Sequence, residues 1–423
     1  MGYRVPATFR DAGTWLRRFA ATTPGAIGVV LVVTTVACVV AGSTVGQQLD
    51  AKIARTDHVL ERTEPLAFAA QSLYVSLSAA DAGAATAFLS GGIESPQVRD
   101  TYEQALAEAA AALAEATVGA TDAQTRTIVA RIAADLPTYT GLVETARANN
   151  RQGFPVGSAY LSQASNLMQT QLLPNAEQLS KARFTAVREE QQRVGALPWT
   201  SIVLILLVLI ACSVGSVVLL RRTNRLVNTG MAFAGAAALL ALLWTVGGTL
   251  TAAQLLDTGS SGAGARVENL AGARILAQQA RTDETLALIT RGDITTKEQA
   301  YQTHLGLLRE RLVAAGVGDS EAERALTNWN AGHNAQRTAY DKADYPGAVA
   351  QSIGTDPESS ATSFARLDQE LRDALAQARD DLRDGVAAAG NSLLLSPYGT
   401  LALLFAAVAA IISGLWPRVQ EFL

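Results

Sequence analysis

Two apolar runs near the middle of the chain constrain its fold more than any other feature of the sequence. The first is Trp199–Leu220 and the second is Gly230–Ala253, and neither contains an acidic or basic residue. At about 1.5 Å of rise per residue, each is long enough to cross a hydrocarbon core of roughly 30 Å as a helix. Similar runs occupy Gly25–Val45 and Tyr398–Leu415. We therefore expect four transmembrane helices.

Arginines beside these runs indicate how the chain is oriented. Arg221, Arg222 and Arg225 lie between the two central runs, and Arg17 and Arg18 precede the first run. Basic residues favour the cytoplasmic side of a membrane, so we expect both termini and the central loop in the cytoplasm. The first run exceeds a signal-peptide core of about 7–15 residues, which favours an uncleaved anchor over a cleaved signal.

This topology leaves two long segments outside the cell. We expect an all-α integral membrane protein of the cell membrane, with two extracytoplasmic four-helix bundles arranged as a tandem repeat. The expected segments are a cytoplasmic N-terminus (1–24), transmembrane helix (25–46), first bundle (47–198), transmembrane helix (199–220), cytoplasmic loop (221–229), transmembrane helix (230–253), second bundle (254–396), transmembrane helix (397–416) and cytoplasmic tail (417–423).

The first outer segment has the helical pattern of a bundle. Gly91-Gly92 ends its first helix, Thr121-Asp122 opens the third, and Pro174 is expected to kink the fourth. Along the first helix, apolar residues recur at spacings of three and four, which places them on one face. They are Leu66, Ala70, Leu73, Leu77, Ala80, Ala84 and Phe88.

The second outer segment shows the same order of signals. Its first helix is expected over Gln254–Thr290. Thr295 with Glu298 forms a capping box for the second helix, and Ser320 with Glu323 forms one for the third. The turn Asp344–Gly347 precedes the fourth helix.

The spacing of turn residues also matches between the two segments. Gly141 precedes Pro155 by the same number of residues that separates Gly332 from Pro346. An aromatic residue stands directly before each proline. This agreement favours two copies of one unit.

Several classes of function are disfavoured. A net charge of −4 without a basic cluster away from the membrane argues against nucleic-acid binding. His58, His304 and His333 have no Cys or acid partner at metal-ligand spacing, so we expect exposed histidines and no metal. No catalytic constellation or phosphate-binding loop is present, so we expect no enzymatic activity and no cofactor. The apolar runs carry no Asp, Glu, Lys, Arg or His, which argues against a transporter.

The far tips of the bundles are the candidate docking site for a partner. Each tip carries an aromatic residue beside a rigid proline, and aromatic anchors dominate many protein interfaces. The alternative is that each aromatic residue folds back to cap its own bundle. The candidate residues are Phe154, Pro155, Tyr345, Pro346, Asn149, Arg151 and Arg291.

The cytoplasmic arginines are the candidates for signal output. They are Arg17, Arg18, Arg221, Arg222 and Arg225. The alternative is that they only orient the chain and contact anionic membrane lipid.

The first outer segment resembles known sensor domains. The stretches LSAADAGAATAFLSGG (Leu77–Gly92) and SPQVRDTYEQALAEAAAAL (Ser95–Leu113) are similar to the first helical hairpin of bacterial chemoreceptor and sensor-kinase bundles. The complete plan resembles the GlnX family of actinobacterial membrane proteins. That resemblance implies a link between an extracytoplasmic glutamine- or glutamate-binding lipoprotein and the cytoplasmic Ser/Thr protein kinase G. It assigns no functional residues to this sequence.

We therefore expect a membrane signalling protein that senses an amino acid of the glutamate, aspartate and glutamine class through a solute-binding lipoprotein. Its output is expected to reach a cytoplasmic Ser/Thr kinase. Direct binding of a small ligand by a bundle is one alternative, and a membrane scaffold or transporter accessory subunit is another. Ligand identity and homo-oligomer formation stay open.

Overall fold

The computed structural model describes residues 22–91, 96–223, 228–257, 259, 262–290, 294–318 and 320–420. All elements in these ranges are helices, which confirms the all-α fold. The chain divides into two compact units. Unit 1 contains Met1–Asp57, Gln192–Leu255 and Ala387–Leu423, and unit 2 contains His58–Gln191 and Leu256–Val386.

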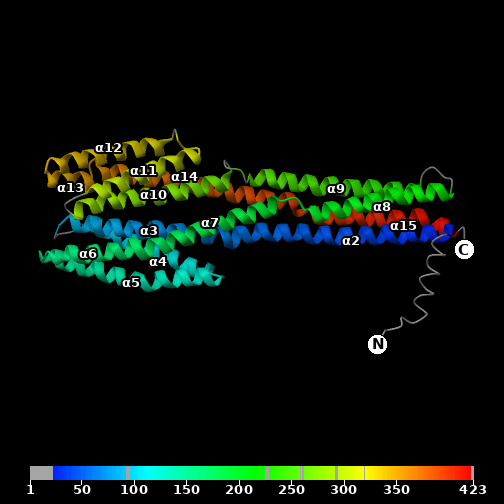
Figure 1. The fold of residues 1–423 in the computed structure, drawn as a ribbon, viewed down its shortest axis with the longest axis horizontal. Helices are drawn as coiled ribbons and strands as arrows, with labels where there is room; N and C mark the ends of the chain where they lie inside the picture. The colour runs from blue at the N-terminus through cyan, green and yellow to red at the C-terminus, as the bar shows by residue number, and fades with distance from the viewer. Residues whose placement is uncertain are drawn as a thin grey trace, which may run out of the picture. The chain divides into compact units, whose positions relative to one another are not determined.

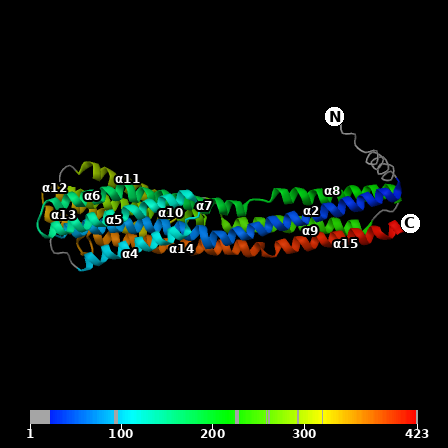
Figure 2. The ribbon, with the colours of Figure 1, turned by 90° about the horizontal axis from the view of Figure 1, so that it is seen from below.

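Unit 1 holds the apolar runs in α2 (Thr23–His58), α8 (Trp199–Thr223), α9 (Thr229–Leu256) and α15 (Ser396–Gln420). Both views show these helices running side by side (Figures 1 and 2). Within the described residues, four helices are long and apolar enough to cross a membrane, so the protein is a multi-pass membrane protein. Large apolar side chains on their outer surfaces, such as Val32, Leu243 and Phe405, are exposed.

Small residues allow close helix packing in unit 1. A Cβ atom added to Gly230 on α9 would collide with the carbonyl oxygen of Ala410 on α15. Asn228 donates a hydrogen bond to the carbonyl of Gly414 at 3.4 Å, and the hydroxyls of Thr245 and Thr400 lie 3.4 Å apart. Small side chains and hydroxyl contacts of this kind hold helices together where no water is available.

Unit 2 contains two helical bundles. The first bundle consists of α3 (Glu64–Leu89), α4 (Pro96–Gly119), α5 (Ala123–Arg151), α6 (Val156–Leu167) and α7 (Leu173–Gly195). The second bundle consists of α10 (Ala263–Thr290), α11 (Thr295–Ala314), α12 (Glu321–Asp341), α13 (Tyr345–Ile353) and α14 (Ser360–Leu394). The two bundles pack against each other along α3 and α10.

Local signals in the sequence set many of these boundaries. The carboxylate of Asp122 accepts a hydrogen bond from the Thr125 N–H at 2.8 Å and caps α5. Gly91, after the end of α3, has a φ of +90°, a conformation that glycine adopts without strain. The apolar stripe of α3 is buried from Leu66 to Ala84, as expected.

Two of the prolines follow short π-helical turns. A π-helical turn, Met168–Leu172, joins α6 to α7 directly before Pro174, where the sequence predicts a kink. A second π-helical turn, Val59–Thr63, joins α2 to α3 directly before the first turn that contains Pro65. Because proline lacks an N–H and its ring crowds the carbonyl four residues earlier, α-helical bonding fails at these places.

Two expected helices are interrupted. The helix expected over Gln254–Thr290 ends at Leu256 and resumes at Ala263. Asp257 between them has a φ of +34°, so the chain leaves the helical conformation there. The fourth helix of the second bundle is also divided, into α13 and α14, because the segment from Gly354 to Ser359 is not helical.

Candidate functional site

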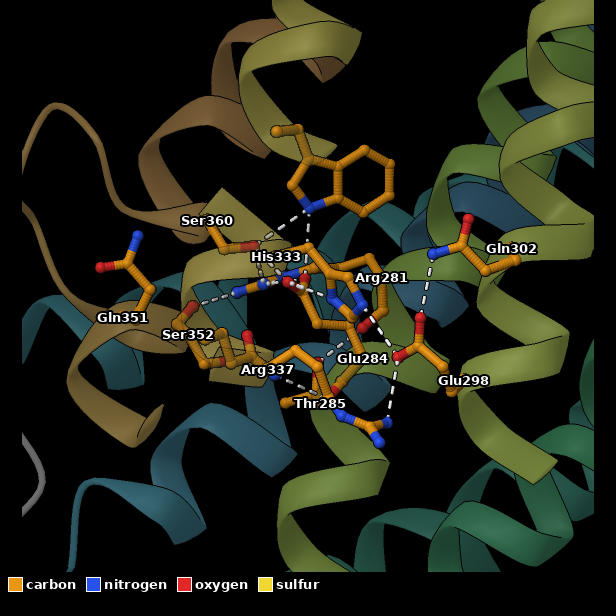
Figure 3. Close-up of polar contacts among 12 residues, drawn as sticks. Arg281, Glu284, Thr285, Glu298, Gln302, His333, Arg337, Gln351, Ser352 and Ser360 are labelled. Atoms are coloured by element: carbon orange, nitrogen blue, oxygen red, sulfur yellow. Dashed lines mark hydrogen bonds and ion pairs between the residues drawn. The ribbon is translucent and has the colours of Figure 1, made fainter. Parts of the chain in front are cut away.

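A buried carboxylate lies at the centre of the second bundle. Glu284 on α10 is 1% exposed, and Arg281 one turn earlier donates to it at 2.5 Å. The hydroxyl of Ser360 on α14 also donates to Glu284, and so does Nε1 of Trp329 on α12, at 3.2 Å. Figure 3 shows these side chains converging from separate helices. The carboxylate therefore ties α10, α12 and α14 together.

His333 extends this network to a fourth helix. Its Nδ1 lies 3.3 Å from Glu284, and its Nε2 lies 3.0 Å from Glu298 on α11 (Figure 3). The imidazole also stacks on Tyr301, with ring centroids 3.7 Å apart. Burial alone would lower the pKa of His333, but the two carboxylates raise it to about 9. The ring is therefore cationic at neutral pH.

The pKa values of the two acids, Glu284 and Glu298, are lowered. Burial alone would raise the pKa of Glu284, but Arg281 and His333 lower it to about 2. The hydrogen bond with His333 also lowers the pKa of Glu298 to about 2. Arg281, Glu284, His333 and Glu298 are thus charged and paired, so the loss of any one of them would leave a buried charge without its partner.

The histidine prediction was wrong for His333, which is 4% exposed, and for His304, which is half-buried and lies 3.0 Å from Asp283 on α10. The acid partners of both histidines stand on other helices, so spacing along the sequence does not reveal them. The capping box at Thr295 was also wrong: α11 is preceded by Ile294, with no side-chain cap, and the Glu298 carboxylate binds Gln302 and His333. The spacing of Arg281 and Glu284 was a usable signal, since residues three apart share a helix face.

The first bundle contains a related arrangement. Asp81 on α3 is 3% exposed and accepts hydrogen bonds from Ser165 at 2.9 Å, Gln169 at 3.2 Å and the Tyr139 hydroxyl at 3.4 Å. The two bundles share a pattern. In each, an acid on the first helix accepts hydrogen bonds from an aromatic side chain on the third helix and from a serine on a later helix. The partners of Asp81 are neutral, whereas Glu284 has cationic partners.

A cleft at one end of unit 2 brings together three of the predicted docking residues, Phe154, Pro155 and Tyr345. The ends of α3, α5, α10 and α12 lie at this end (Figure 1). The cleft has a volume of about 430 Å³ and is lined by Phe154, Pro155 and Ser158 of the first bundle, and by Ile289 and Tyr345 of the second. We call it the tip cleft. Both bundles therefore contribute an aromatic residue to one cavity.

The two aromatic residues of the tip cleft differ in their surroundings. Phe154 is 52% exposed, whereas the hydroxyl of Tyr345 donates to the carbonyl of Leu288 at 2.9 Å. Phe154 thus has the exposure expected of a docking residue, and Tyr345 makes the kind of contact expected of a cap.

The other predicted partner residues do not line the tip cleft. Asn149 donates to the Thr145 carbonyl at 2.8 Å, and Arg151 and Pro346 are exposed. Arg291 lies outside the described residues.

The candidate output arginines are described only in part. Arg221 is exposed near the end of α8, and Arg222 belongs to the same helix. Arg17, Arg18 and Arg225 lie outside the described residues.

A larger groove runs between the bundles. It has a volume of about 560 Å³ and lies between α7 of the first bundle and α10 and α11 of the second. Acidic and basic side chains share its walls with Phe184 and Leu307. The charged and polar lining residues include Glu177, Lys181, Glu268, Gln279, His304 and Arg311. We call it the inter-bundle groove.

Comparison with known proteins gives one match. No curated protein and no solved structure matches this chain. Residues 55–192 match the family model of the Actinobacterial sensor domain, a range that starts in α2 and extends through the first bundle into α7. The first bundle is therefore similar to a sensor domain of actinobacteria, and this similarity supports a sensing role for the membrane protein.

Proposed function

We propose that this protein senses an extracytoplasmic amino acid of the glutamate, aspartate and glutamine class through a solute-binding lipoprotein that docks at the tip cleft. The lipoprotein-bound state is relayed to a cytoplasmic Ser/Thr kinase. The observation that carries the docking site is the meeting of Phe154 and Tyr345 in one cavity of about 430 Å³ formed by both bundles. A partner seated there contacts both bundles at once.

The chemistry of the tip cleft suits a protein partner. Phe154 offers an exposed aromatic ring beside Pro155, whose ring fixes the local backbone. Aromatic residues in rigid settings lose little conformational entropy on binding, and they contribute much of the affinity at interfaces. Tyr345, held by Leu288, supplies a fixed wall against which a partner residue can pack.

The relay follows the helical segment from Gly25 to Leu89. This segment consists of α2, the π-helical turn Val59–Thr63 and α3. A movement of α3 is then transmitted along the same segment. The two bundles act as two copies of one sensory unit, which their matching buried acids support. We place both termini and the loop with Arg221, Arg222 and Arg225 in the cytoplasm.

Co-purification tests the docking site. The full chain, tagged and solubilised in mild detergent, is incubated with the extracytoplasmic solute-binding lipoproteins of its own source cell. Phe154→Ser should reduce lipoprotein retention at least about tenfold, the effect expected for an aromatic anchor. Its thermal melting should stay unchanged because the ring is exposed.

Val118→Ser is the matched control, since Val118 is an apolar residue that is 88% exposed and lies outside the tip cleft. Val118→Ser should bind like the unaltered protein. Equal retention by Phe154→Ser and the unaltered chain would refute docking at the tip cleft.

Direct ligand binding in the inter-bundle groove is the second candidate. The groove offers carboxylates and cations within one volume of about 560 Å³, a combination that suits a zwitterion. Thermal melting of the isolated protein with glutamate, aspartate or glutamine tests this candidate. A saturable rise in melting temperature that Lys181→Gln removes would favour direct binding, and no rise would exclude these three ligands.

A further inference from the structure

A smaller cleft on unit 2 is rich in arginine. Its volume is about 280 Å³, and its walls come from α3 and α4 of the first bundle and from α10 and α14 of the second. We call it the arginine cleft. Its polar lining residues are Gln71, Ser72, Glu115, Arg274, Arg372 and Arg379.

Two acids beside the arginine cleft, Asp368 and Glu64, are each shared between two arginines. Asp368 accepts from Arg274 at 2.9 Å and from Arg372 at 2.9 Å. Each guanidinium carries a full positive charge, and one carboxylate neutralises only one of the two.

The same arrangement occurs at Glu64. This carboxylate accepts from Arg379 at 2.5 Å and from Arg383 at 2.6 Å. Adding the carboxylate of Glu115 still leaves more positive than negative charge around the arginine cleft. The Arg379 guanidinium also lies over the Phe68 ring, 4.2 Å from its centroid, and this contact holds the cation at the wall of the cleft.

Gln71 provides an independent sign of a ligand. Its side chain lines the arginine cleft, is 2% exposed, and has an amide nitrogen, Nε2, without a hydrogen-bond partner. A buried donor without an acceptor is rare and destabilising. An anion oxygen in the cleft would satisfy this donor and the surplus positive charge together.

We propose that the arginine cleft binds a small oxyanion, either a carboxylate or an inorganic phosphate or sulfate. Arginine recognises both kinds because its paired N–H groups match two oxygens of such an anion. The bound anion contacts α3 of the first bundle and α14 of the second, and so holds the two bundles together. Its use as a signal rests on the proposed function, whereas its binding does not.

Thermal melting of the full chain in detergent tests the proposal. The probes are sodium phosphate, sodium sulfate and sodium succinate, each compared with sodium chloride at equal ionic strength. At least one oxyanion should raise the melting temperature by several degrees in a saturable manner, because a ligand that binds only the folded state stabilises it. The succinate series distinguishes a carboxylate ligand from an inorganic one.

Three variants separate binding from structural support. Gln71→Leu should leave the anion-free melting temperature equal or higher, because it removes an unpaired buried donor, and should weaken anion affinity about tenfold. Arg372→Gln should weaken anion affinity by a similar factor, and its side chain is exposed enough for the fold to tolerate the change. Arg131→Gln, at an exposed arginine of α5, should behave like the unaltered chain.

Two results would overturn the oxyanion site: no saturable rise with any of the three anions, or full affinity in both Gln71→Leu and Arg372→Gln. Retention of the lipoprotein is read in a separate assay. A chain that binds the anion but no lipoprotein would contradict the proposed function alone, and the reverse outcome would contradict only the oxyanion site.

Discussion

Nε2 of His333 on α12 lies 3.0 Å from Oε2 of Glu298 on α11, and this contact joins two helices whose pairing the sequence pattern does not reveal. The same imidazole reaches Glu284 on α10 at 3.3 Å. His333 therefore stands between two carboxylates from separate helices. The stability of the second bundle should depend on whether this histidine is charged.

The first prediction concerns pH. The pKa of His333 is raised from 6.5 to about 9, so the folded state favours the protonated ring. The stabilisation is fully present below about pH 6.5 and is lost as the pH rises through 9. The rise in the pKa of His333 corresponds to a stabilisation of the folded state on the order of 3 kcal/mol. The melting temperature of the unaltered protein should fall between pH 6.5 and 9.5, as followed by circular dichroism.

His333→Gln serves as the comparison for this pH series. Its melting temperature should be lower at pH 6.5, and its decrease towards pH 9.5 should be much smaller. If both proteins lose the same number of degrees over this range, His333 is not the titrating group.

The second prediction contrasts the two buried acids. Glu284→Gln should cost about 3–5 kcal/mol, because it leaves the buried Arg281 and His333 without their shared counter-charge. Asp81→Asn should cost about 1 kcal/mol or less, because Ser165, Gln169 and Tyr139 are neutral partners. Denaturant unfolding of the two variants measures both values. Equal losses would show that charge pairing is not what separates the two sites.

The third prediction concerns two glycines that occupy matching positions in the sequence. A Cβ atom on Gly332 would lie 2.9 Å from the backbone nitrogen of Ser360, so Gly332→Ala should cost about 1–3 kcal/mol through overpacking. Nothing lies within 4 Å of a Cβ on Gly141, so Gly141→Ala should stabilise α5 by up to about 1 kcal/mol. Thermal melting of the two variants should move in opposite directions, and a shift in the same direction would contradict the packing difference.

The fourth prediction tests whether Tyr345 acts as a cap. Tyr345→Phe removes the hydrogen bond to the Leu288 carbonyl and should cost about 1 kcal/mol, or about 2–4 °C in melting temperature. Lipoprotein retention should persist because the ring still forms the wall of the tip cleft. Unchanged melting together with lost retention would instead assign the hydroxyl to the partner interface.

The sequence by itself determined the helical fold, the four apolar runs and most helix ends. Asp122 and Ser320 cap α5 and α12, and Pro174 follows a π-helical turn. The capping box expected at Ser320 forms only in part, because the Glu323 carboxylate binds Arg309. These features act through neighbours within about four residues, because capping, helical periodicity and proline geometry are local effects. A pattern read along the chain is sufficient to find them.

Only the tertiary structure decided which residues meet across helices. Glu298 satisfies the local rule for a capping box, yet its carboxylate binds His333 because the packing of α11 on α12 places the imidazole there. Gly141 and Gly332 are equivalent in the sequence, but only Gly332 contacts another backbone. In the sequence, nothing distinguishes Gln71 from other helix residues. The arginines that lie beside it in the arginine cleft come from α10 and α14. Contacts of this kind depend on how separate helices pack, and local propensity carries no information about that packing.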